Sequence, residues 1–95
     1  MENIVFNKED IQFLATVEGM WVGGTPKSDD DMKNLKFGTL LAASGYSLKS
    51  KHYELTEKLL TLAEAKAKTV IDLHFCFNQW IDFTYKARGG ISSFY

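Results

Sequence analysis

The chain has 95 residues and a formal net charge of −1, with 45% hydrophobic and 14% aromatic residues and a single cysteine. This composition predicts one folded domain over residues 1–95 with its own core, and it argues against a disordered chain. The charge argues against nucleic acid as the main partner, because phosphate binding usually requires a clustered excess of Lys and Arg.

A first helix is predicted to begin after Asn7, near the start of the chain. Asn7 can cap it, and the acidic residues that follow suit the positive end of the helix dipole. We expect the helix to end at about Met20 or Trp21, because the run GGTP at 23–26 breaks it. Its inward side chains are expected to be Ile11, Leu14, Val17 and Trp21.

A second helix is predicted to start at Ser28, whose acidic successors form a favourable first turn. We expect it to continue to Gly45, a candidate for the left-handed residue that ends a helix. Gly38 lies inside this helix and costs about 1 kcal/mol relative to alanine, so it is a candidate for a close crossing with a neighbouring helix. Its apolar face is expected to comprise Met32, Leu35, Leu40 and Leu41.

Residues 54–68, ELTEKLLTLAEAKAK, predict a third helix because they are rich in strong helix formers. Leu55, Leu59 and Leu62 mark its apolar stripe. Neither glycine nor proline occurs between this helix and the apolar segment that follows it. The two segments could thus form one long helix, whereas a kink or break near 66–69 would make the C-terminal half a helical hairpin.

Residues 69–85, TVIDLHFCFNQWIDFTY, fit two kinds of secondary structure. Alternation favours a β-hairpin over 69–86, but Asn78-Gln79 is a poor hairpin turn. We prefer a helix, since basic residues followed by Gly89-Gly90 resemble a helix C-terminus. The helix would have an inner stripe of Val70, Leu73, Phe77, Trp80, Ile81 and Thr84, opposite Thr69, Asp72, Cys76, Gln79, Asp82 and Lys86.

The predicted fold class is therefore all-α, a small bundle of three to four helices; the alternative is α+β with a C-terminal hairpin at 69–86. We expect the aromatic run at 69–85 to form an interior scaffold, since exposing it forfeits about 1.5 to 3 kcal/mol per large side chain. The other interpretation of the aromatic surplus is a binding or self-association face. The apolar tail at 91–95 is expected to pack onto the body or onto a partner.

The residues Asp72, His74 and Cys76 are the only cluster of reactive types. On a helix His74 points away from the other two, so we expect no metal, no cofactor and no enzymatic activity. We expect no membrane segment, because polar residues interrupt the longest apolar run, and no signal peptide. A single cysteine excludes an internal disulfide and suits the cytoplasm.

This profile predicts a non-catalytic module that binds another protein, such as a stoichiometric inhibitor, an immunity protein or a phage-type anti-defence protein. The acidic turn could steer it toward a basic surface. The alternative is a homo-oligomer that buries the aromatic run and encloses a small anion near Lys49, Lys51 and Arg88. The residues predicted to bind the partner are Asp29, Asp30, Asp31, Trp21, Trp80 and Tyr95.

Overall fold

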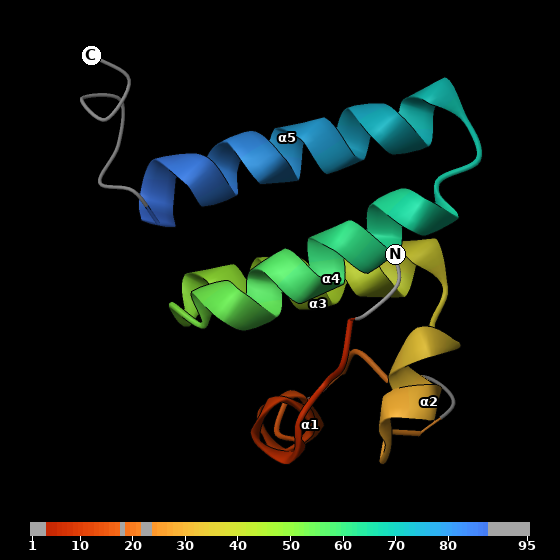
Figure 1. Ribbon diagram of the computed structural model, residues 1–95, viewed down its shortest axis with the longest axis vertical. Coiled ribbons are helices and arrows are strands. Elements are labelled where there is room, and N and C mark those ends of the chain that lie inside the picture. The colour runs from red at the N-terminus through yellow and green to blue at the C-terminus, as the bar shows by residue number, and fades with distance from the viewer. Residues whose placement is uncertain (1–3, 18, 22–23, 88–95) are drawn as a thin grey trace.

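The computed structural model describes residues 4–17, 19–21 and 24–87. These residues contain no strand and five helices: α1 (Lys8–Ala15), α2 (Asp29–Lys33), α3 (Phe37–Lys49), α4 (Tyr53–Lys66) and α5 (Val70–Ala87). The prediction of a small all-α bundle is confirmed, and the alternative hairpin at 69–86 is wrong. Figure 1 shows three layers, with α5 on one side of the α3–α4 pair and with α1 and α2 on the other.

Helix α1 begins as predicted and ends earlier. The Asn7 side chain accepts a hydrogen bond from the Asp10 amide at 2.8 Å, and the Asp10 carboxylate accepts one from the Asn7 amide at 3.1 Å. This reciprocal capping box fixes the start. The helix ends at Ala15, where the Thr16 hydroxyl donates to the Phe13 carbonyl at 2.6 Å. The expected extension to Met20 or Trp21 is therefore wrong, because local hydroxyl bonding replaces the next helical turn.

The predicted second helix is divided into α2 and α3 by residues 34–36. The start at Ser28 is correct, since its hydroxyl accepts a hydrogen bond from the Asp31 amide at 3.1 Å. The break arises from α4: the Lys66 ammonium donates to the carbonyls of Lys33 at 2.5 Å and Leu35 at 2.6 Å. These bonds satisfy carbonyl groups that the end of α2 leaves without helical partners.

Gly45 does not end α3, contrary to the prediction. The helix continues to Lys49, and Ser47 and Leu48 in this last part are buried. The chain reverses instead at Lys51, which adopts a left-handed conformation with φ of 65°. Burial of the last turn therefore outweighs the tendency of a glycine to terminate a helix.

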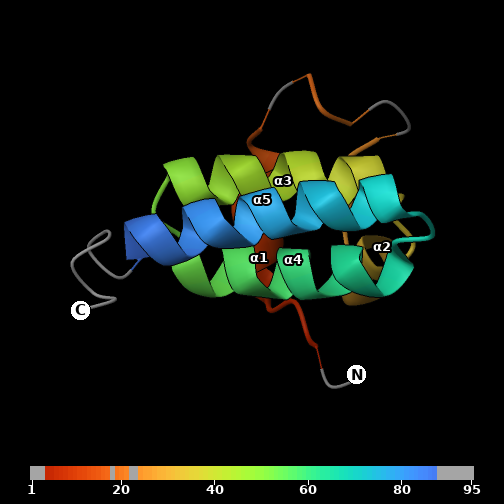
Figure 2. The same ribbon diagram turned by 90° about the horizontal axis from the view of Figure 1, so that it is seen from above.

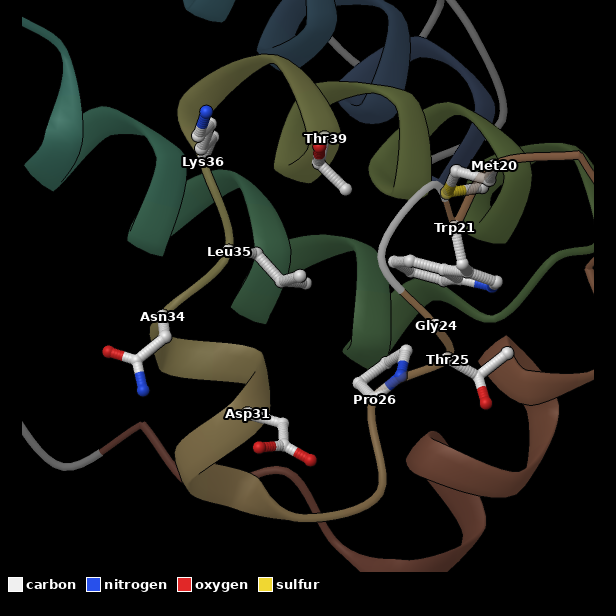
Figure 3. Close-up of a pocket in the computed structure, with 10 residues that line it drawn as sticks. All are labelled: Met20, Trp21, Gly24, Thr25, Pro26, Asp31, Asn34, Leu35, Lys36 and Thr39. Atoms are coloured by element: carbon white, nitrogen blue, oxygen red, sulfur yellow. The ribbon is translucent and has the colours of Figure 1, made fainter.

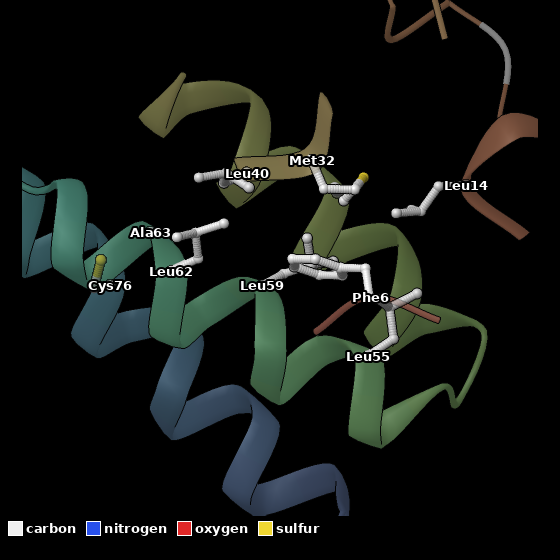
Figure 4. Packing of buried hydrophobic residues seen from close by; sticks show 10 residues of the cluster. Phe6, Leu14, Met32, Leu40, Leu55, Leu59, Leu62, Ala63 and Cys76 are labelled. Atoms are coloured by element: carbon white, nitrogen blue, oxygen red, sulfur yellow. The ribbon is translucent and has the colours of Figure 1, made fainter. Parts of the chain in front are cut away.

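The core is formed by α3 and α4, with residues from the N-terminal segments packed against them (Figure 4). At the α3–α4 contact the Ser47 and Thr56 hydroxyls lie 2.7 Å apart, within hydrogen-bond distance of each other. The Ser47 hydroxyl also lies 2.9 Å from the Ser44 carbonyl, and the Thr56 hydroxyl lies 2.9 Å from the His52 carbonyl. These buried polar groups are thus satisfied. The buried apolar side chains in this cluster are Phe6, Leu14, Met32, Leu40, Ala43, Leu55, Leu59, Leu62, Ala63 and Cys76.

Helix α5 follows a break at 67–69, as predicted. The Thr69 hydroxyl accepts a hydrogen bond from the Asp72 amide at 3.0 Å, and the Asp72 carboxylate accepts one from the Lys68 amide at 2.9 Å. The chain then returns across both α3 and α4 (Figure 2). Neither α5 nor any other helix in the described ranges is long and apolar enough to cross a membrane.

The close approach of helices occurs at Gly45 and not at Gly38. A Cβ atom built on Gly45 would lie 3.5 Å from the side-chain nitrogen of Gln79 on α5, whereas one on Gly38 meets nothing within 4 Å. The same Gln79 nitrogen donates to the Ser44 hydroxyl at 3.1 Å. The prediction of Gly38 as the crossing residue was therefore wrong. Helix α5 passes α3 at Gly45, about one turn before the C-terminal end of α3.

A matched pair of glycine substitutions tests this packing. We expect Gly45→Leu to lower the free energy of unfolding by about 1–3 kcal/mol, because the new side chain must displace Gln79 and α5. Gly38→Leu should raise it by about 0.5 kcal/mol, since leucine is the better helix former and has open space there. Chemical denaturation followed by circular dichroism measures both. Equal effects would mean that α5 does not pass close to Gly45.

Candidate partner-binding surface

The most unusual surface is the outward face of α5. The sequence predicted Val70, Phe77 and Ile81 to face inward, but these side chains are 81%, 61% and 67% exposed. Cys76, predicted on the opposite side, is 2% exposed and is the buried residue of this helix. The prediction that these three residues face inward was therefore wrong. The helix is oriented so that Val70, Phe77 and Ile81 face solvent.

The inward face of α5 has its own set of contacts, which explains this orientation. Besides the Gln79 bond to α3, the Trp80 indole donates to the Glu64 carboxylate of α4 at 3.2 Å. Trp80 also packs edge-on against Phe83, with ring centroids 5.7 Å apart, and Phe83 packs edge-on against Tyr53 of α4. Part of the aromatic run thus fills the α4–α5 contact as expected for a scaffold. The remainder forms a second apolar face.

Seven large apolar side chains of α5 are 40–81% exposed. At these exposed fractions they present roughly 800 Å² of surface in total, which exceeds the largest apolar patch of an ordinary monomer. Asp82 lies beside them, with its carboxylate 3.5 Å from the Lys86 ammonium, so its charge is partly balanced. The seven residues are Val70, Ile71, Leu73, Phe75, Phe77, Ile81 and Tyr85.

The three predicted acidic residues have different surroundings. Asp29 accepts a hydrogen bond from the Phe6 amide at 2.8 Å and lies 3.0 Å from the Lys33 ammonium. The hydrogen bond from the Phe6 amide is the main cause that lowers the pKa of Asp29. Burial acts in the opposite direction but is the weaker effect, and Lys33 lowers the pKa further. Asp31 accepts a bond from the Lys27 amide at 2.8 Å, whereas Asp30 is exposed. Two of the three therefore hold the N-terminal segment and the α2 turn in place.

Trp21 and Asp31 line one pocket of about 670 Å³, which Met20 and residues 24–26 border on one side and residues 34–36 with the start of α3 on the other (Figure 3). Its indole nitrogen donates to the Leu14 carbonyl at 3.0 Å, which fixes the ring against α1. Trp80 belongs to the α4–α5 contact on the other side of the α3–α4 layer. The predicted Tyr95 lies outside the described residues. The structure therefore brings Trp21 and Asp31 together and leaves Trp80 apart from them.

The reactive residue types do not form a common site in the described part of the chain. Cys76 is buried while His74 is exposed on another face of the same helix. Burial raises the pKa of the Cys76 thiol, and the charges of Glu64 and Asp72 raise it further. Residues 4–17, 19–21 and 24–87 contain no group of three His, Cys, Asp or Glu side chains placed to hold a metal ion. Lys49 and Lys51 are exposed, and Arg88 lies outside the described residues.

Comparison of the chain with protein-family models, curated proteins and solved structures finds no match. No relative therefore indicates a function. Among the described surfaces of the chain, the outward face of α5 is the one that ordinary folding explains least.

Two aspartate substitutions distinguish the hydrogen bonding of Asp29 from the mere presence of negative charge at the start of α2. Asp29→Asn should lower the free energy of unfolding at neutral pH by about 1.5 kcal/mol, because it weakens a charged hydrogen bond and an ion pair. Asp30→Asn removes the same charge from the same helix and should have little effect.

The pH dependence of the Asp29 effect has a definite sign. Its folded pKa is below the ordinary value of 3.8, so the stabilisation is complete above that value and is lost as pH falls through the lower folded pKa. The difference between the wild type and Asp29→Asn should therefore shrink only in acid, as measured by urea unfolding at several pH values. A difference that already disappears near neutral pH would contradict this assignment.

Thiol reactivity tests the placement of Cys76. In the folded chain the thiol should react with a disulfide reagent at least about tenfold more slowly than in denaturant, because it is buried and its pKa is raised. A Glu57→Cys variant supplies an exposed thiol on α4 as the control. A native Cys76 that reacts as fast as this control would place it in an accessible site.

Proposed function

We propose that this chain is a non-catalytic module that works by binding another protein through the outward face of α5. The single observation that supports this is the seven-residue apolar surface on a helix whose other face is already packed. Complete burial of each such side chain stabilises by about 1.5 to 3 kcal/mol. A partner that covers this face would therefore gain much of its affinity from it.

The kind of module we propose is a stoichiometric inhibitor, an immunity protein or a phage-type anti-defence protein, which acts by occluding a partner's surface. The chemistry of α5 favours a partner with an apolar groove or patch. Asp30 is exposed on α2, on the opposite side of the α3–α4 pair from α5 (Figure 1), so its charge would attract a basic partner from a distance without adjoining the apolar face. We propose a cytoplasmic location, since the single buried thiol suits a reducing compartment.

A homo-oligomer is the second candidate function, and the same apolar surface favours it. The small anion that we associated with this alternative has less support. Lys49 and Lys51 are exposed at the α3–α4 connection, and the third residue of that set is outside the described range.

Affinity capture with the full chain tests the proposed function. Phe77→Glu should remove proteins captured by the wild type, because a carboxylate would have to be buried in the apolar contact. Thermal unfolding should change little, since Phe77 is mostly exposed. Val5→Glu is the matched control, because Val5 is also an exposed apolar residue but lies outside α5.

A second set of variants tests the residues that the sequence predicted. Charge reversal at Asp30 and alanine at Trp21 or Trp80 should weaken capture if these residues also contact the partner. Loss of thermal stability in the tryptophan variants would instead show that they serve the fold. Capture that survives Phe77→Glu and is lost on the Asp30 reversal would move the interface from α5 to the acidic turn.

A further inference from the structure

Six residues define a narrower band on the outward face of α5, which we call the outer stripe: Val70, His74, Phe77, Asn78, Ile81 and Tyr85. All six are exposed. At 3.6 residues per turn they fall within about 100° of the helix circumference, the width of a face that packs against one other helix. The stripe carries no carboxylate, ammonium or guanidinium group.

The positions of the outer stripe are symmetric along the helix. Residues 70 and 85, 74 and 81, and 77 and 78 are each equally distant from the midpoint between residues 77 and 78. When two identical helices pack antiparallel about a two-fold axis at that midpoint, every stripe position therefore faces another stripe position. Every α-helix has this positional symmetry. What is particular to α5 is that all the paired positions are exposed and carry no formal charge, so the stripe can serve both sides of an isologous two-fold interface.

The side chains at facing positions are chemically compatible. Val70 would face Tyr85 of the second copy, and His74 would face Ile81, so each large side chain meets a smaller or flatter one. At the axis, Phe77 meets its own copy, and two Asn78 amides can donate to and accept from each other. A polar residue such as Asn78 at the axis of a largely apolar seam favours one register over others.

The outer stripe supplies much of the area that a dimer needs. Its four apolar side chains, Val70, Phe77, Ile81 and Tyr85, are 52–81% exposed and present roughly 500 Å². With the apolar side chains on either side of the stripe, α5 presents roughly 800 Å², about the area that a standard protein interface buries on each partner. No neighbouring element of the described chain covers this face, because α5 forms the outer layer of the bundle (Figure 1). Resting on the proposed α5 interface and on the second candidate function, the homo-oligomer, we infer that α5 binds a second copy of this chain, packed with its α5 antiparallel to the first.

Light scattering and sedimentation over a dilution series test the dimer with the full chain. We expect a dimer at micromolar concentration that dissociates on dilution. Phe77→Glu should weaken it by at least about 30-fold, because it places two like charges at the axis. Val5→Glu should leave the dissociation constant unchanged, and circular dichroism verifies that both variants fold.

Cysteine cross-linking tests the antiparallel register. With a short bifunctional maleimide, Asn78→Cys should cross-link to itself across the axis. Val70→Cys alone should not cross-link to itself. Position 70 faces position 85 of the second copy, fifteen residues from that copy's own position 70, so the two substituted side chains would lie roughly 22 Å apart along the helix. A mixture of Val70→Cys and Tyr85→Cys should cross-link. The wild type controls for Cys76, and Glu57→Cys controls for random collision.

The outcomes separate this inference from the proposed function. Self-cross-linking of Val70→Cys would overturn the antiparallel arrangement. A strict monomer at micromolar concentration whose Phe77→Glu variant loses a captured partner would overturn the dimer and leave the proposed function intact. A strict monomer whose captured proteins are unchanged by Phe77→Glu would overturn both.

Discussion

The small side chains on the buried face of α3 determine how the other helices can pack. Ala43, Ser44 and Ser47 are fully buried there, and Gly45 lies between them. Such a surface lets neighbouring helices approach closely, and α4 packs on it with leucines and a threonine hydroxyl, while the Gln79 side chain of α5 bonds to it. A bulkier side chain at Gly45 or Ser44 would overpack this contact. Trp80 and Phe83 of α5 pack against α4 instead, and the remaining large apolar side chains of α5 lie on its other face.

Local features of the fold could be predicted because short-range hydrogen bonds determine them. Asn7 and Ser28 cap their helices with residues three positions away, and the same is true of Thr69 at the start of α5. The break between α2 and α3 has a different origin. Lys66 reaches carbonyls more than thirty residues earlier in the chain, and no local pattern reports such a contact. Helix existence was therefore predictable here, whereas helix length depended on distant partners.

The orientation of α5 was mispredicted because hydrophobicity does not orient a helix that is apolar on two faces. The 3.6-residue periodicity predicted that the helix face with Phe77 and Ile81 points inward, because this face carries more large apolar side chains than the opposite one. The contacts of Gln79 with α3 and of Trp80 with α4 fix the orientation, and these depend on residues in other helices. The charge of Asp29 led to the prediction that it binds a partner, and this stays a prediction. What the sequence did not indicate is that its carboxylate accepts a hydrogen bond from the Phe6 amide and pairs with Lys33.

The position of α5 joins the stability of this fold to its proposed activity. One fully buried side chain, Cys76, and a few polar and aromatic contacts attach the helix to the bundle. Anything that binds the folded chain and not the unfolded one adds its binding free energy to stability. A second copy on the outer stripe would cover α5 from the outside and so hold it against α3 and α4. The same helix would thus close the core on one face and form the interface on the other.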